Sequence, residues 1–129
     1  MKINAEEIKA VANLEPLKRY KYLIKKIADN EVFYTLLNSE NDYAISELEN
    51  HFLIPFWSAK EFAESCLIDD WKTFKITEIS LDDFEEKMID FLNENNYLMN
   101  MFPIENKTGF IVDVNEFVRD LNDELENYN

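Results

Sequence analysis

Residues 16–37, PLKRYKYLIKKIADNEVFYTLL, change their hydrophobic period partway along and decide the fold class. From Leu17 to Ile27, apolar residues recur three or four positions apart, which is typical of one buried helix face, and Pro16 suits a first helical turn. Residues 32–37 are instead a β-rich run. The segment therefore predicts a helix followed directly by a strand.

Helical and strand patterns continue to alternate along the rest of the chain. Further strands are predicted at residues 43–48, 51–56, 74–79, 97–102 and 110–114, the first of them in a hairpin with residues 32–37. Helices are predicted at residues 5–14, behind a Ser58–Glu61 capping box, after Ser80, and after Asp113 or Asn115. The order ααβββαβαββα indicates an α+β fold, with helices packed over a mainly antiparallel sheet of about six strands.

One domain accounts for the length of the chain. Its 129 residues are enough to build a hydrophobic core without disulfides or metal, and no Pro- or Gly-rich linker interrupts them. We therefore expect residues 1–129 to form a single domain, with residues 1–15 as a peripheral N-terminal helix.

The charge is strongly negative and unevenly distributed. The net charge is −14, and residues 78–129 hold 14 acidic and 3 basic residues, a net of −11. Such a field repels phosphate backbones and anionic lipids but attracts basic proteins. Acids at the N-terminus disfavour a signal peptide, and the longest apolar run is far shorter than a membrane span. We expect a cytoplasmic protein that binds neither nucleic acid nor membranes.

Patterns for catalysis or metal binding are weak. Cys66 and His51 are the only cysteine and the only histidine, which excludes an internal disulfide and disfavours a zinc or haem site. Nothing in the pattern supplies His51 with a nucleophile or an orienting carboxylate. Cys66 shares a predicted helix face with Phe62 and Ala63, which indicates burial. No catalytic residue, metal ion or cofactor is predicted.

Two groups of side chains are candidates for binding. Acidic residues cluster on the last two predicted helices, at Asp83, Glu86, Asp90, Glu94, Asp120, Asp123 and Glu124. They form either a solvated face or a surface that captures a basic protein. Four aromatic residues surround a strand-to-helix turn, at Phe56, Trp57, Phe62 and Trp71. They form either core or the floor of a ligand pocket or interface.

Several segments together resemble a bacterial family over nearly the whole chain. They are residues 19–29 (RYKYLIKKIAD), the hairpin that follows, Pro55-Phe56-Trp57 with Glu61-Phe62-Ala63, Trp71, Ile79-Ser80-Leu81 with Phe84, and Met101-Phe102-Pro103. The family is DUF2750, a domain of unknown function. The resemblance implies a small bacterial cytosolic protein and supplies no catalytic residues.

A second resemblance, to the SseB-type N-terminal domain, covers the second half of the chain. It rests on a strand leading into Phe56-Trp57-Ser58 and a helix, and on a late strand that ends at Pro103. The usual Asn-Pro ending is Phe102-Pro103 here. This resemblance implies a binding or immunity-type role.

The sequence therefore favours a non-enzymatic interaction module, immunity-type or regulatory, that uses its acidic surface to bind a basic protein. The alternative is a small-molecule-binding domain with an aromatic pocket around Trp57 and Trp71. An enzyme built on surface carboxylates is the least favoured function. Oligomeric state and the identity of the partner stay open.

Overall fold

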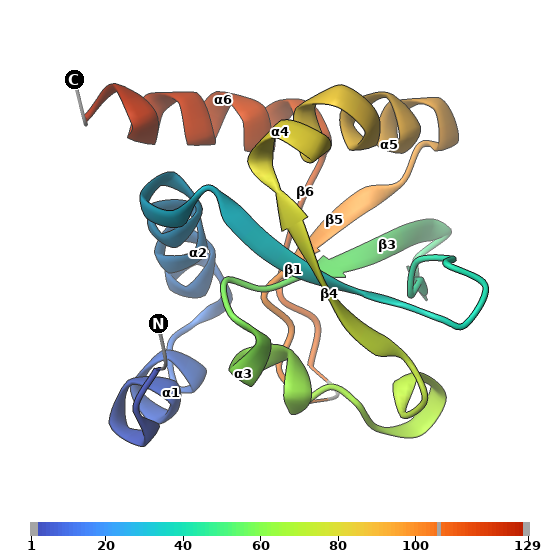
Figure 1. The fold of residues 1–129 in the computed structure, drawn as a ribbon, viewed down its shortest axis with the longest axis horizontal. Helices are drawn as coiled ribbons and strands as arrows, with labels where there is room; N and C mark the ends of the chain where they lie inside the picture. Colours follow the sequence, from blue (N-terminus) through green and yellow to red (C-terminus); the bar gives the residue numbers. More distant parts are fainter. Residues whose placement is uncertain (1–2, 106, 128–129) are drawn as a thin grey trace.

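The computed structural model describes residues 3–105 and 107–127 as an α+β fold, shown in Figure 1. The elements are α1 (Ala5–Ala12), α2 (Pro16–Asn30), β1 (Val32–Leu37), β2 (Ser46–Leu48), β3 (His51–Phe56), α3 (Lys60–Glu64), the 3₁₀ turn η1 (Asp69–Trp71), β4 (Lys75–Ser80), α4 (Leu81–Asp83), the π-helical η2 (Phe84–Met88), α5 (Ile89–Asn95), β5 (Leu98–Met101), β6 (Phe110–Val112) and α6 (Val114–Glu126). The predicted α+β class is confirmed. Residues 1–2 of the predicted N-terminal segment lie outside the described residues.

The strands form two sheets, so the prediction of a single sheet was wrong, although three of the four strand pairings are antiparallel as expected. One sheet is the antiparallel pair β1–β4, and the other has the order β2-β3-β5-β6, in which β3 and β5 run parallel. Besides a 2.7 Å hydrogen bond from the Thr35 hydroxyl to the Pro55 carbonyl, one backbone bridge joins the two sheets among the described residues. There the Tyr34 and Trp57 backbones exchange N–H···O bonds of 2.8 and 2.9 Å. Local sequence patterns do not determine which strands pair when the strands lie far apart in the sequence.

The predicted hairpin between residues 32–37 and 43–48 is also replaced. β1 pairs along its whole length with β4, and its link to the following segment is the bridge between Leu37 and Tyr43. β2 pairs instead with β3 across a two-residue turn, Glu49–Asn50, in which both residues have positive φ. Such a turn matches the twist of paired strands but usually carries Asn-Gly, so Glu-Asn gave no signal.

Helix α2 follows the predicted stripe with one exception. Tyr20, Leu23, Ile24 and Ile27 are buried, whereas Leu17 is 45% exposed. Pro16 occupies the first turn, where its missing N–H costs no hydrogen bond. The stripe therefore faces the core except at its first residue.

Side-chain caps fix the starts of two other helices as predicted. Ser80 accepts a hydrogen bond from the Asp83 N–H at the start of the continuous helical segment α4–η2–α5. Asp113 and Glu116 form a reciprocal capping box at the start of α6. The capping box predicted at Ser58 is wrong, because Ala59 is the N-cap of α3 and no side chain caps that helix.

The core is centred on Phe33, near the start of β1. Its fully buried ring lies 5.5 Å from the ring of Phe56 on β3, 5.3 Å from Phe84 on η2 and 6.0 Å from Phe117 on α6, measured between centroids. Aromatic pairs at such distances contribute beyond the area that they bury. This cluster holds both sheets and the two C-terminal helical segments together.

The only glycine is required by a close backbone approach. A Cβ atom at Gly109 would lie 2.1 Å from the Met101 carbonyl oxygen, while the Gly109 N–H donates to Asn100 Oδ1 at 2.8 Å. Because the obstructing atom belongs to the backbone, a side chain would force the strands apart. Gly109 thus lets β6 return beside β5.

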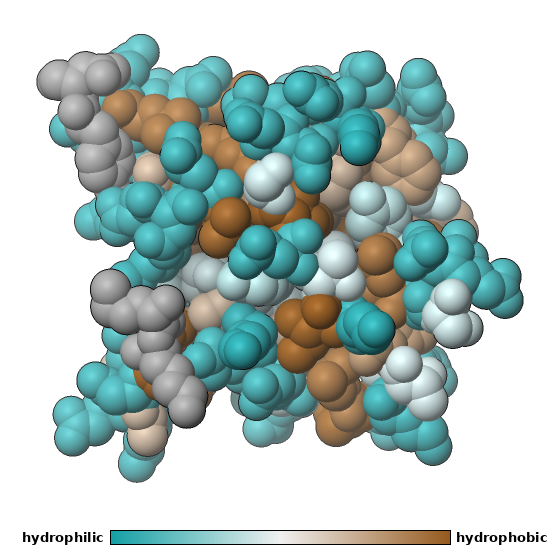
Figure 2. Space-filling model, in the orientation of Figure 1, coloured by the Kyte–Doolittle hydropathy of each residue, from teal (hydrophilic) through white to brown (hydrophobic). Residues whose placement is uncertain are grey.

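The helices cover the sheets unevenly. Helices α4, α5 and α6 lie along one side of the molecule, and α2 packs against β5, β6 and α6 (Figure 1). Figure 2 shows hydrophilic side chains crowded over α4 and α5, with hydrophobic side chains visible over β1 and β4. The outer face of the β1–β4 sheet is therefore only partly covered.

The Phe33 cluster generates the first prediction. Replacing Phe33 with Ala should lower the free energy of unfolding by about 3 to 5 kcal/mol, because it empties the centre of the core. The matched control is Phe52→Ala, at a ring that is 46% exposed, which should cost less than about 1.5 kcal/mol. Denaturant unfolding measures both, and Phe33→Leu gives a milder comparison. Equal losses for Phe33→Ala and Phe52→Ala would contradict the placement of the core.

Candidate functional site

A groove between α2 and α6 has an apolar floor and charged walls. This α2–α6 groove, of about 470 Å³, is lined by Leu17, Tyr20, Lys21, Ile24, Lys25, Phe110, Val112, Glu116, Asp120, Asp123, Glu124 and Asn127. Tyr20 stacks on Phe110 with ring centroids 5.2 Å apart, which forms the floor together with Ile24. Leu17 also lines the groove, and 45% of this large apolar side chain is exposed.

The α6 wall of the groove is acidic. It carries four carboxylates against two lysines on the α2 wall. Asp120 accepts a hydrogen bond of 2.7 Å from the Tyr20 hydroxyl, and this bond links α6 to α2. Burial, followed by the hydrogen bond to Asp120, raises the pKa of Tyr20, which keeps the phenol protonated as a donor. Asp123 and Glu124 also lie on this wall.

The other predicted acidic residues lie elsewhere. Asp83, Glu86, Asp90 and Glu94 are all exposed on the α4–η2–α5 segment. None of them lines the α2–α6 groove. The structure therefore separates the seven predicted residues into three beside an apolar floor and four on an exposed helical surface.

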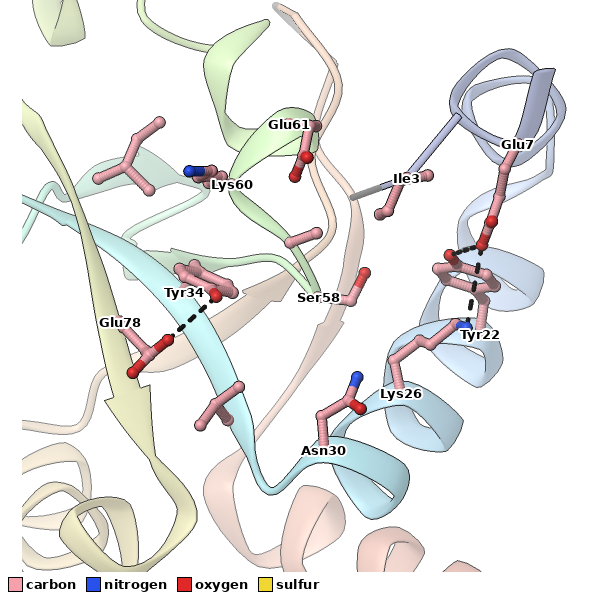
Figure 3. Close-up of a pocket in the computed structure, with 13 residues that line it drawn as sticks. Ile3, Glu7, Tyr22, Lys26, Asn30, Tyr34, Ser58, Lys60, Glu61 and Glu78 are labelled. Atoms are coloured by element: carbon pink, nitrogen blue, oxygen red, sulfur yellow. Dashed lines mark hydrogen bonds and ion pairs between the residues drawn. The ribbon is translucent and has the colours of Figure 1, made fainter. Parts of the chain in front are cut away.

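A second hollow lies on the other side of α2. This tyrosine cleft, of about 820 Å³, is lined by Ile3, Glu7, Tyr22, Lys26, Asn30, Val32, Tyr34, Ser58, Ala59, Lys60, Glu61, Ile76 and Glu78. Figure 3 shows the Tyr34–Glu78 pair on one side and the Glu7–Tyr22–Lys26 group on the other, with Ser58 between them. Residues from α1, α2, β1, α3 and β4 thus meet around one opening.

Both tyrosines in this cleft donate to carboxylates. The Tyr34 hydroxyl donates to Glu78 at 3.1 Å, and the Tyr22 hydroxyl donates to Glu7. Burial raises the pKa of each phenol, and the neighbouring carboxylate raises it further. Lys26 Nζ lies 3.9 Å from the Glu7 carboxylate and 5.5 Å from the centre of the Tyr22 ring. Each tyrosine of the cleft is therefore paired with a carboxylate, and Lys26 lies beside the Glu7–Tyr22 pair.

Ser58 differs from these groups. It is 7% exposed, and its hydroxyl has no hydrogen-bond partner in the part of the chain that the structure describes. A buried hydroxyl without a partner costs free energy. Because α3 is not capped by this side chain, the hydroxyl is left for the cleft.

Comparison with known proteins identifies the family. Residues 20–121 match the model of a family described as "Protein of unknown function (DUF2750)". The chain belongs to the DUF2750 family. No curated protein matches it.

The DUF2750 match includes most of both sites. It takes in Tyr22, Tyr34 and Ser58 of the tyrosine cleft, and it ends before Asp123 on the acidic wall of the groove. It begins after Leu17. The likeness to the SseB-type domain stays a prediction.

The predicted aromatic group is divided between core and surface in this DUF2750 chain. Phe56, Trp57 and Phe62 are buried, and Trp57 Nε1 donates to the Pro103 carbonyl at 2.8 Å. Trp71 is half-buried and lines a different groove, beside Ile68. The four side chains are not brought together around one of the two hollows described above.

Between residues 3 and 127, leaving out 106, no helix combines the length and apolarity needed to cross a membrane. Over the same residues, no three His, Cys, Asp or Glu side chains are gathered as metal ligands.

Cys66 is buried as predicted, although α3 ends at Glu64 and Cys66 lies in the turn that follows rather than on a helical face. The residue is 1% exposed, and its thiol lies 3.5 Å from the Pro103 carbonyl oxygen and 3.6 Å from that of Glu105. Burial raises the pKa of the Cys66 thiol. The thiolate that attacks reagents is therefore scarce at neutral pH.

A thiol-labelling experiment tests this placement. Cys66 should react with an aromatic disulfide reagent far more slowly in the folded protein than in denaturant, because labelling requires the core to open. Absorbance of the released thiol follows the reaction. Equally fast labelling under native conditions would mean that Cys66 is exposed.

Proposed function

We propose that the chain is a non-enzymatic interaction module of the cytoplasm, regulatory or immunity-type, that holds a basic amphipathic helix of a partner protein in the α2–α6 groove. The observation that carries the proposal is an apolar groove floor, with Leu17 exposed beside it, that borders an acidic wall. Helix-in-groove recognition needs both features, since apolar anchors enter the floor and flanking charges face the walls.

The apolar floor supplies most of the affinity. Fully burying one leucine-sized side chain is worth about 1.5 to 3 kcal/mol. Leu17 offers only part of that gain, because 45% of it is exposed before a partner binds. Phe110, half-buried over Tyr20, offers a second contact for an apolar side chain.

The acidic wall selects the sign of the partner's charge. Exposed ion pairs contribute only about 0 to 1 kcal/mol each, so the wall adds little affinity by itself. The net charge of −11 over residues 78–129 raises the encounter rate with basic proteins and disfavours the binding of acidic ones. Both the regulatory and the immunity-type versions of the proposal require this selectivity.

A designed peptide tests the role of the floor. The peptide carries leucine on one helical face and lysine elsewhere, and a shuffled peptide of equal composition is its control. Leu17→Ser should weaken binding by roughly tenfold, because it removes an apolar contact worth about one unit of log affinity. Leu48→Ser, at an equally large side chain that is 41% exposed on β2, should leave binding unchanged. Fluorescence anisotropy measures the dissociation constants.

Charge reversals test the role of the wall. The double variant Asp123→Lys with Glu124→Lys should slow association with the peptide, whereas Asp90→Lys with Glu94→Lys changes the net charge equally on the α5 surface and should slow it less. Asp120 is left unchanged because it accepts from Tyr20. Equal effects of both pairs, or equal binding of the shuffled peptide, would mean that the acidity serves solubility alone.

A further inference from the structure

The tyrosine cleft contains an unpartnered polar group that points to a ligand. The Ser58 hydroxyl is more than nine-tenths buried, has no hydrogen-bond partner among the described residues and faces the cleft between α2 and β1 (Figure 3). The cleft measures about 820 Å³. Small-molecule sites typically occupy about 300 to 1,000 Å³.

The hydrogen-bonding capacity left in the cleft defines what a ligand must offer. The tyrosine hydroxyls already donate to Glu7 and Glu78, so these tyrosine and carboxylate oxygens can only accept further bonds. Lys60 offers donors only, and Ser58 offers both a donor and acceptors. A ligand therefore needs groups that donate at some points and accept at others, which a hydroxyl does with a single oxygen.

The charges of the cleft disfavour a charged ligand. Three carboxylates and two ammonium groups line it, and Lys26 already lies against Glu7. An anion would meet the carboxylates within a protein of net charge −14. A cation would compete with Lys26 for Glu7 and lose its own hydration. A neutral molecule meets neither cost.

We propose that the tyrosine cleft binds a small, neutral, polyhydroxylated molecule of the monosaccharide or cyclitol class, with Ser58 hydrogen-bonded to one of its hydroxyls. The Tyr22 and Tyr34 side chains on opposite sides of the opening supply amphipathic surfaces for its C–H groups. This site lies on a different side of α2 from the α2–α6 groove, so it does not depend on the binding of a basic partner.

An NMR titration of the full chain tests the proposal. D-glucose, D-galactose and myo-inositol serve as neutral probes, and glycine and inorganic phosphate serve as charged ones. At least one neutral probe should shift the backbone amides of residues 30–34, 58–61 and 76–78 in a saturable way at millimolar concentration. Ser58→Ala should weaken this binding roughly threefold to tenfold, the value of one hydrogen bond. Ser39→Ala, in the exposed turn after β1, should leave it unchanged.

Three results would overturn the proposal. The first is the lack of saturable shifts at the cleft for every neutral probe. The second is Ser58-dependent binding of glycine or phosphate without binding of the neutral probes, which would assign a charged ligand. The third is an unfolding midpoint of Ser58→Ala clearly below that of the unmodified chain, which would mean that the hydroxyl is bonded within the fold.

Tyr34→Phe, which removes one hydroxyl from the cleft, should also weaken binding.

Discussion

The fold depends on the burial of one aromatic ring between two sheets. Phe33 belongs to the β1–β4 pair, yet it contacts rings on β3, η2 and α6. The two sheets also share the hydrogen bond from Thr35 to Pro55 and one backbone bridge, between Tyr34 and Trp57. Because β1 directly follows α2, fixing β1 at the centre also helps to place α2 against β5, β6 and α6. The α2–α6 groove and the tyrosine cleft both border α2 and depend on this arrangement.

Local features of the fold were predictable, and long-range ones were not. The α2 stripe and the caps at Ser80 and Asp113 follow from residue spacing within one helix, and Cys66 is buried as predicted although it lies beyond the end of α3. The pairing of β1 with β4 joins segments about 40 residues apart, and no local pattern encodes such a choice. The Glu49–Asn50 turn lacks the usual glycine, so the hairpin was assigned to the wrong pair of strands.

The candidate sites were predictable only in part. Asp123 and Glu124 were singled out by charge, but the apolar floor beside them depends on Leu17 being exposed at the end of an otherwise buried stripe. Ser58 matched a capping pattern and was assigned to the backbone for that reason. The Ser58 hydroxyl does not cap α3 because that helix begins after Ala59, and residue spacing alone did not reveal this start. In both cases, a residue that departs from its pattern forms part of a site.

The proposed function requires apolar contacts in the α2–α6 groove to hold a basic helix. Intermolecular nuclear Overhauser contacts in the complex with the leucine–lysine peptide test it most directly. We expect contacts from the peptide leucine methyls to Leu17, Ile24 and Phe110 in the groove. Contacts to the exposed side chains of Ile45 and Ile68 instead, or binding without any contact to leucine methyls, would contradict it.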